Sequence, residues 1–285
     1  MTGVRVVDTL TGQAEVIPAR LVFLCASAMA STQILMNSRP EGSGRSHFDA
    51  SGTLGRYVMD HIFRVGVGGE IPGMTEYIEY GRRPGGVYIP RFRNVDGEEG
   101  VGFKRGYGYQ GSAYRSPADP QGFGAAMKHG MRQYGPWRLS MGAFGECLPY
   151  EDNRVSLHPD KVDRFGLPLL RFDVTFRDNE MRMMDDARTE GEKMLRAAGL
   201  LNVWSSRGEH VPGDAIHEMG GARMGADPRE SVLNKWSQAH DAANLFVTDG
   251  AQMASNSCVN PSLTFMAFTA RAANRAVEQL QAGAI

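Results

Sequence analysis

The sequence predicts a mixed fold, in which one part alternates strands with helices and another is built on a largely antiparallel sheet. Residues 21–25 form a continuous apolar run typical of a strand buried on both faces, and helical spacing follows at residues 32–37. A second short apolar strand at residues 244–247 precedes a long helix that opens at Pro261. Between these parts, residues 66–204 contain mostly strand-like fragments and one helix.

The individual elements follow in order. Residues 4–8 and 14–17 alternate as two strands of a hairpin, and they lead into the apolar strand at residues 21–25. In the middle, strands are predicted at residues 87–93 and 137–148, and a strand, turn and strand at residues 152–168. Residues 178–198 have helical apolar spacing and end at Gly199, a residue suited to a helix C-terminus.

Composition excludes several classes of protein. A net charge of −1 over 285 residues provides no basic field for nucleic acid. No apolar run reaches the roughly 18 residues of a membrane helix. The three cysteines lie far apart, without the spacing of a zinc site or a disulfide framework, so no metal is expected. The beginning of the chain lacks a signal-peptide pattern. We expect a soluble protein, cytoplasmic or periplasmic depending on sequence upstream.

The segment at residues 216–225 (IHEMGGARMG) is the most informative for chemistry. Its glycines allow the backbone to approach a flat ligand, and a neutral imidazole such as that of His217 suits proton abstraction from a hydroxyl. The alternative is a histidine hydrogen-bonded inside a loop. Zinc binding through an HExxH motif fails, because position 221 is Gly.

Two further segments carry a structural and a functional interpretation. Asp249 and Gly250 follow the strand at residues 244–247, at the edge where α/β folds bind ligands, although an Asp-Gly pair is also an ordinary turn. Asn260 and Pro261 fit the N-cap and first position of a helix without any function. The same helix start also offers free N–H groups to a developing anion.

Taken in order, these segments resemble the C-terminal part of the glucose–methanol–choline (GMC) oxidoreductases, which use FAD. Four segments carry the resemblance: residues 19–28 with Ser38, residues 54–61 (LGRYVMDH), residues 216–225 and residues 249–264. The resemblance implies that residues 1–65 and 205–285 form the C-terminal part of a Rossmann-like FAD-binding domain. A substrate-binding domain at residues 66–204, built on an antiparallel sheet flanked by helices, is inserted between them.

The resemblance also implies roles for single residues. His217 matches the active-site base that accepts the hydroxyl proton of the substrate while a hydride leaves its carbinol carbon for N5 of FAD. Asn260 matches the partner that orients the same oxygen. The residues implied to lie against FAD are Ala26, Asp249, Gly250, Asn260, Pro261 and Thr264.

Residues 217–241, 88–93 and 105–111 look most like bacterial gluconate and glucoside-3 dehydrogenases, which favours a sugar, glycoside or alcohol substrate and a dehydrogenase over an oxidase. Tyrosine rings stack on sugars and guanidinium groups donate to hydroxyls. The substrate contacts expected on this ground are Tyr107, Tyr109, Gln110 and Arg91. The alternative for each aromatic residue is a place in the core of the substrate domain.

Two departures from the family pattern matter. Residues 26–28 are Ala-Ser-Ala where many members have Ala-Gly-Ala, and the Gly-x-Gly-x-x-Gly loop that holds a dinucleotide is absent. We therefore expect an N-terminal half or partner subunit to complete the site, and an electron-acceptor subunit is a further expected partner. The competing hypothesis is a truncated chain or a non-autonomous subunit that is inert alone. A plain carbohydrate-binding module is disfavoured, since it would not need His217, Asp249 and Asn260.

Overall fold

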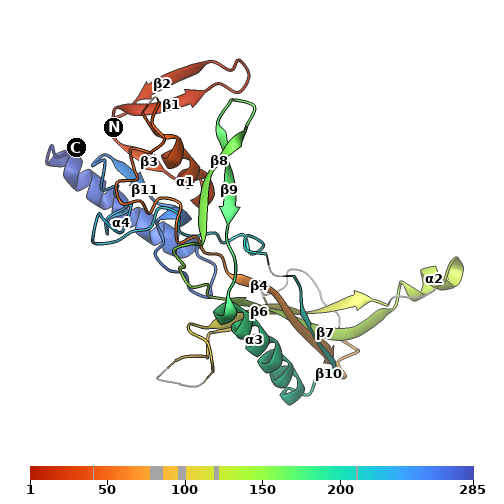
Figure 1. The fold of residues 1–285 in the computed structure, drawn as a ribbon. Coiled ribbons are helices and arrows are strands. Elements are labelled where there is room, and N and C mark those ends of the chain that lie inside the picture. The colour runs from red at the N-terminus through yellow and green to blue at the C-terminus, as the bar shows by residue number, and fades with distance from the viewer. Residues whose placement is uncertain (41, 78–85, 96–100, 119–121, 210) are drawn as a thin grey trace.

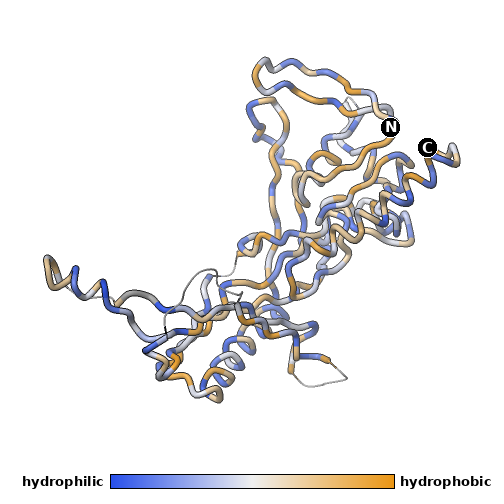
Figure 2. The backbone as a smooth tube through the Cα atoms, turned by 180° about the vertical axis from the view of Figure 1, so that it is seen from behind, coloured by the Kyte–Doolittle hydropathy of each residue, from blue (hydrophilic) through white to orange (hydrophobic). Residues whose placement is uncertain are grey.

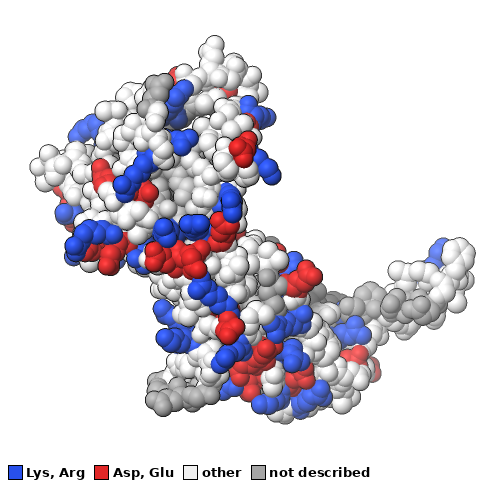
Figure 3. All heavy atoms as spheres, in the orientation of Figure 1, with Lys and Arg blue, Asp and Glu red and all other residues white. Residues whose placement is uncertain are grey.

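The computed structural model describes residues 1–40, 42–77, 86–95, 101–118, 122–209 and 211–285, which form two regions (Figure 1). One region, in the upper part of the figure, contains both ends of the chain. The other contains an antiparallel sheet and a long helix. Acidic and basic side chains are interspersed over both regions on the face shown in Figure 3. Within the described residues, no helix combines the length and apolarity needed to cross a membrane.

The antiparallel sheet has five strands in the order β10-β4-β7-β6-β5. Their bounds are Leu201–Arg207 for β10, Ile62–Ile71 for β4, Tyr134–Gly145 for β7, Tyr107–Pro117 for β6 and Val87–Ile89 for β5. Every neighbouring pair is antiparallel, as the sequence predicts for this part. The predicted strand at residues 87–93 is shorter than expected, because β5 ends before Pro90, which has no backbone N–H for a ladder.

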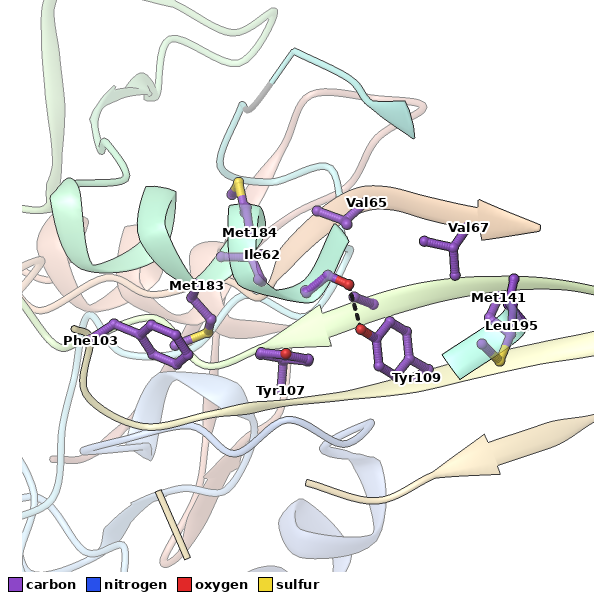
Figure 4. Packing of buried hydrophobic residues seen from close by; sticks show 12 residues of the cluster. Ile62, Val65, Val67, Phe103, Tyr107, Tyr109, Met141, Met183, Met184 and Leu195 are labelled. Atoms are coloured by element: carbon purple, nitrogen blue, oxygen red, sulfur yellow. Dashed lines mark hydrogen bonds between the residues drawn. The ribbon is translucent and has the colours of Figure 1, made fainter. Parts of the chain in front are cut away.

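Helix α3 (Asp178–Ala197) covers one face of this sheet. Alternate strand residues such as Val65, Val67 and Met141 point toward the helix and pack on Met183 and Met184 (Figure 4). The residues between them point to the opposite face of the sheet. As the sequence predicts, α3 ends just before a glycine in the left-handed conformation, with φ of 82° at position 199.

The second region is built on two parallel strands, β3 (Val22–Leu24) and β11 (Leu245–Val247). Helix α1 (Ala28–Asn37) packs on the face that presents Val22 and Val247, and α4 (Ser262–Gln281) on the face of Phe23 and Phe246. Both faces are thus covered, as expected. However, β3 is only half-buried, because among the described residues it has one neighbouring strand.

Two hairpins and one arm project from these regions. The hairpin of β1 (Gly3–Val7) and β2 (Ala14–Pro18) matches the sequence prediction, and its apolar residues stay exposed along β2 (Figure 2). The strands β8 (Arg154–Val162) and β9 (Pro168–Asp173) pair as the predicted strand, turn and strand. The short helix α2 (Ala125–Gly130) lies on the arm between β6 and β7 (Figure 1).

Candidate active site

His217 lies on a loop whose backbone is held by one buried carboxylate. Oδ2 of Asp60 accepts hydrogen bonds from the backbone N–H groups of Gly213 (2.7 Å) and Ala215 (3.1 Å), and Oδ1 accepts from that of His217 (3.2 Å). Asp60 is 2% exposed. A buried charge is tolerated when several N–H groups donate to it, so this contact fixes the loop firmly.

Both ring nitrogens of His217 have side-chain partners. Nδ1 lies 3.0 Å from Nδ1 of His61, and Nε2 lies 3.1 Å from Nδ2 of Asn260. The ring of Phe144 lies beside the imidazole, with 6.0 Å between the centroids. His217 is half-buried and Asn260 is exposed, so the edge carrying Nε2 is the one on which a ligand can approach.

Asn260 does not cap the helix that follows it, which corrects one interpretation of the sequence. Helix α4 begins at Ser262 with Pro261 in the N-cap position, and no side chain caps it. Instead, Oδ1 of Asn260 accepts a hydrogen bond from Nε2 of Gln110 at 2.7 Å. The Asn260 amide is therefore held between β6 and His217, which favours the functional interpretation of this residue over the capping one.

Asp249 and Ala26 meet where the parallel strands β3 and β11 end, as the position of both residues after a strand predicts. Oδ1 of Asp249 accepts from the backbone of Ala251 at 2.9 Å, and the hydroxyl of Ser31 donates to Oδ2. Ser31 also accepts from the backbone N–H of Ala26 at 3.1 Å. Burial raises the pKa of Asp249, and these hydrogen bonds oppose the shift.

Gly250 and the start of α4 lie between the ends of the parallel strands β3 and β11 and His217. A Cβ at position 250 would come within 2.5 Å of the backbone oxygen of Glu218, the residue after His217, so only glycine fits. Pro261 is buried and Thr264 is half-buried, whereas Leu263 is 77% exposed and Met266 is 67% exposed. The first turn of α4, without a side-chain cap and next to His217 and Asn260, suits an anionic ring system.

The structure places Tyr107 and Tyr109 in the core, which corrects the expectation that they contact substrate. Both residues are 0% exposed and pack on α3 (Figure 4). Because side chains alternate along β6, Gln110 lies on the opposite face of the sheet. The Tyr107 hydroxyl donates to Asp186 at 2.6 Å, and the Tyr109 hydroxyl donates to the backbone oxygen of Ala187. The alternative interpretation of these aromatics as core is the correct one.

Arg91 also serves the fold and has no contact with His217 or Asn260 among the described hydrogen bonds. Its guanidinium donates to the buried carboxylate of Glu146 at 2.9 Å and to the backbone oxygens of Arg93 and Asn94. Of the four predicted substrate contacts, only Gln110 lies at the site.

A cavity of about 440 Å³ opens on the face of the sheet that carries Gln110 and Phe144. It is lined by Phe63, Gly66, Ser140, Gly142, Ser206 and Arg207, among others. Phe63 contacts Phe144 (5.1 Å between ring centroids), and Phe144 contacts His217, so these two rings connect the cavity to the imidazole. The cavity floor is largely backbone, since Gly66 and Gly142 pair directly across β4 and β7.

Sequence reasoning did not assign a role to Asp60 or His61, although both stand in the Gly-Arg…Asp-His segment at residues 54–61. The signal that could have pointed to these two residues is an Asp-His pair placed just before a long strand. In the described part of the chain, no three His, Cys, Asp or Glu side chains converge in a way that could hold a metal ion.

Comparison with known proteins identifies the family. Residues 149–269 match the family model described as GMC oxidoreductase. The C-terminal part of the chain thus belongs to the GMC oxidoreductases. The chain is 31% identical to 2-methyl-1,2-propanediol dehydrogenase of Mycolicibacterium austroafricanum, over 95% of this chain and 50% of the relative. It is 26% identical to the fructose dehydrogenase large subunit of Gluconobacter japonicus, over 95% of this chain and 49% of that relative.

The fold agrees with this GMC assignment. Formate oxidase of Aspergillus oryzae superposes with a TM-score of 0.61 at 14% identity, covering 96% of this chain and 56% of the other. The chain spans about half the length of the curated relatives it matches, and corresponds to the C-terminal part of a GMC oxidoreductase. The cofactor of GMC oxidoreductases is FAD.

Proposed function

We propose that this chain, joined with the N-terminal half that its relatives possess, oxidises a CH–OH group of a sugar, glycoside or related alcohol. His217 is the base and Asn260 is its partner. The observation that carries this proposal is the 3.1 Å contact between Nε2 of His217 and Nδ2 of Asn260, on the exposed edge of the imidazole. A substrate hydroxyl placed there would meet a proton acceptor and an N–H donor together.

The protein's part in the reaction is to hold the hydroxyl and take its proton. Nε2 of His217 accepts the proton of the substrate hydroxyl. The amide of Asn260 donates a hydrogen bond to the hydroxyl oxygen and so keeps that oxygen oriented. The C–H bond of the carbinol carbon breaks as its hydride departs, and a carbonyl group forms. FAD, when bound, supplies the acceptor of that hydride at N5.

Several residues of this chain suit a place against the flavin. Asp249 and Gly250 lie where β11 ends, with Ala26 at the end of the adjacent β3, and Pro261 and Thr264 lie at the start of α4. The uncapped N-terminus of this 20-residue helix favours negative charge, and a reduced flavin is anionic. We accordingly assign residues 1–65 and 205–285 to the FAD-binding domain and 66–204 to the substrate domain.

The substrate class is inferred from the cavity and from the relatives. Ser140 and Ser206 in the cavity lining offer hydroxyl groups. Phe63 in the lining and Phe144 packed against it offer apolar faces. This combination suits a polyol or sugar ring. The matched dehydrogenases, one named for a diol and one for fructose, agree with such a substrate.

The test is flavin reduction under anaerobic conditions in the complete protein, with sugars, glycosides and diols as reductants. His217→Ala should lower the reduction rate by roughly 10²–10⁴-fold. His129→Ala, at an exposed position of α2, is the matched control and should leave the rate unchanged. The proposal fails if no alcohol or sugar bleaches the flavin of the unmutated protein. It also fails if the flavin of the His217→Ala variant is reduced at the unmutated rate.

A second candidate is that the chain is inert without its complementing half. The apolar side chains exposed on α4 and along β2, Leu263, Met266, Val16 and Ile17, support it. We also infer an electron-accepting partner subunit, since the Gluconobacter relative is named as a large subunit. The chain alone and the chain co-expressed with the upstream half should be compared for bound FAD. Stoichiometric, micromolar FAD binding by the chain alone would exclude this candidate.

A further inference from the structure

His61 and Asp60 are adjacent in the chain and both contact His217. Asp60 accepts hydrogen bonds from the backbone of the loop, and Nδ1 of His61 lies 3.0 Å from Nδ1 of the His217 ring. The backbone N–H of His61 also donates to Oδ1 of Asp60 at 2.8 Å, so the two residues that contact His217 are hydrogen-bonded to each other. His61 is 1% exposed, so its ring cannot turn to water.

The four side chains of Gln110, Asn260, His217 and His61 form a hydrogen-bonded row with a defined direction. Gln110 donates to Oδ1 of Asn260, which leaves Nδ2 of Asn260 to donate to Nε2 of His217. Nε2 of His217 therefore carries no proton, and Nδ1–H of His217 donates to Nδ1 of His61. His61 must then carry its own proton on Nε2.

The surroundings of His61 agree with this direction. The backbone of Ser257 raises the pKa of His61. Nε2 of His61 is buried and has no hydrogen-bond partner among the described residues. Burial, followed by the nearby His217, lowers the pKa of His61 to about 4 in spite of Asp60. His61 thus stays neutral and able to accept a hydrogen bond.

We propose that His61 is a positioning residue that holds His217 in the Nδ1–H tautomer. The lone pair of Nε2, which accepts from Asn260 in this structure, is then available to a substrate hydroxyl that takes the place of that contact. The proposal rests on the function proposed for His217. A base is usable only when its unprotonated nitrogen faces the proton to be taken, and the group on the other ring nitrogen decides which nitrogen that is. In this chain a second, neutral imidazole takes that place, and it continues to accept from Nδ1–H once His217 is protonated.

The direct test is the tautomer of His217, read from its ring ¹⁵N shifts by NMR. The full chain is labelled at its seven histidines and measured at pH 8, with His217→Gln used for assignment. The unmutated chain should show a protonated Nδ1 and an unprotonated Nε2. His61→Leu removes the acceptor and should shift the population toward Nε2–H. His61→Asn, of similar size, places an amide oxygen near the position of Nδ1 and should keep the Nδ1–H form.

The second test measures flavin reduction in the complete protein. His61→Leu should lower the limiting reduction rate roughly 10- to 100-fold, with the half-saturating substrate concentration within threefold of the unmutated value. His61→Asn should recover most of the rate. Equal rates in both variants, or an unchanged His217 tautomer in His61→Leu, would overturn the proposal. A different result would separate the two proposals. If no substrate reduces the flavin but the tautomer of His217 shifts as expected, then the function proposed for His217 is wrong and the positioning role of His61 stands.

Discussion

The side-chain nitrogen of Gln110 lies 2.7 Å from Oδ1 of Asn260, so one amide decides the orientation of the other. Gln110 is on β6 in the antiparallel sheet, whereas Asn260 precedes α4 in the region that contains both chain ends. This hydrogen bond therefore crosses between the two regions and sets the face that Asn260 presents to His217.

Exchanging Gln110 for glutamate should disturb that orientation. A carboxylate cannot donate to Oδ1 of Asn260, and it would draw the Asn260 amide nitrogen toward itself and away from His217. We expect the flavin reduction rate to fall roughly 10- to 100-fold, equivalent to about 1–3 kcal/mol of lost hydrogen bonding. Stopped-flow absorbance measures this rate. Gln13→Glu, the same exchange in an exposed turn, should have no effect, and an equal loss there would point to a general charge effect.

Replacing Asn260 by alanine separates the two interpretations of this residue. A lost helix cap would cost about 1 kcal/mol of unfolding free energy. Because Asn260 is not the cap of α4, we expect a change below about 0.5 kcal/mol in urea denaturation. The reduction rate should fall roughly 10²–10³-fold, as when a donor to a reacting oxygen is removed. The reverse pattern, lower stability with an intact rate, would restore the capping interpretation.

Tyr107→Phe tests the place of this tyrosine in the core. The hydroxyl donates to Asp186 at 2.6 Å, and burial raises its pKa well above the ordinary range. Its loss should lower the unfolding free energy by about 1–2 kcal/mol. The half-saturating sugar concentration should stay unchanged, and Tyr77→Phe, at an exposed position, serves as the control. A raised half-saturating concentration without loss of stability would indicate a substrate contact after all.

His61 should make the stability of the chain sensitive to mild acid. Its pKa is about 4 in the folded chain, against an ordinary value of 6.5, and it faces His217 and Asp60. Between these two values the unfolded state binds a proton that the folded state does not. The free energy of unfolding should therefore fall as the pH drops from 6.5 to 4, by at most about 3 kcal/mol. Urea denaturation at pH 7.5 and 5.0 measures this loss, which should be smaller in His61→Asn.

The sequence predicted the larger elements because they carry strong local signals. The apolar run before Ala26, the spacing of α3 with its terminal glycine and the helix after Pro261 all depend on neighbouring residues, and each is present. The predicted pair of His217 and Asn260 is also brought together. These two residues lie 43 positions apart. They were predicted from the order of the segments that resemble the GMC family, and not from a local pattern.

What the sequence could not supply was the direction in which strand residues point. Tyr107, Tyr109 and Gln110 lie within four positions on β6, and a pleated strand sends alternate residues to opposite faces. Only the packing of α3 decides that the tyrosines are in the core and that Gln110 faces the site. Similarly, the contact of His61 with His217 spans 156 positions, and no local pattern reports it.

Gly142 lies in the cavity floor between Gly66 and Gln110, and the space above it is open. A Cβ at this position would have only the backbone oxygen of Val65 nearby, at 4.0 Å. Packing therefore does not require glycine there, in contrast to Gly250. We infer that the bare backbone at Gly142 widens the cavity, so Gly142→Ala or Gly142→Val should narrow the range of alcohols that reduce the flavin of the complete protein.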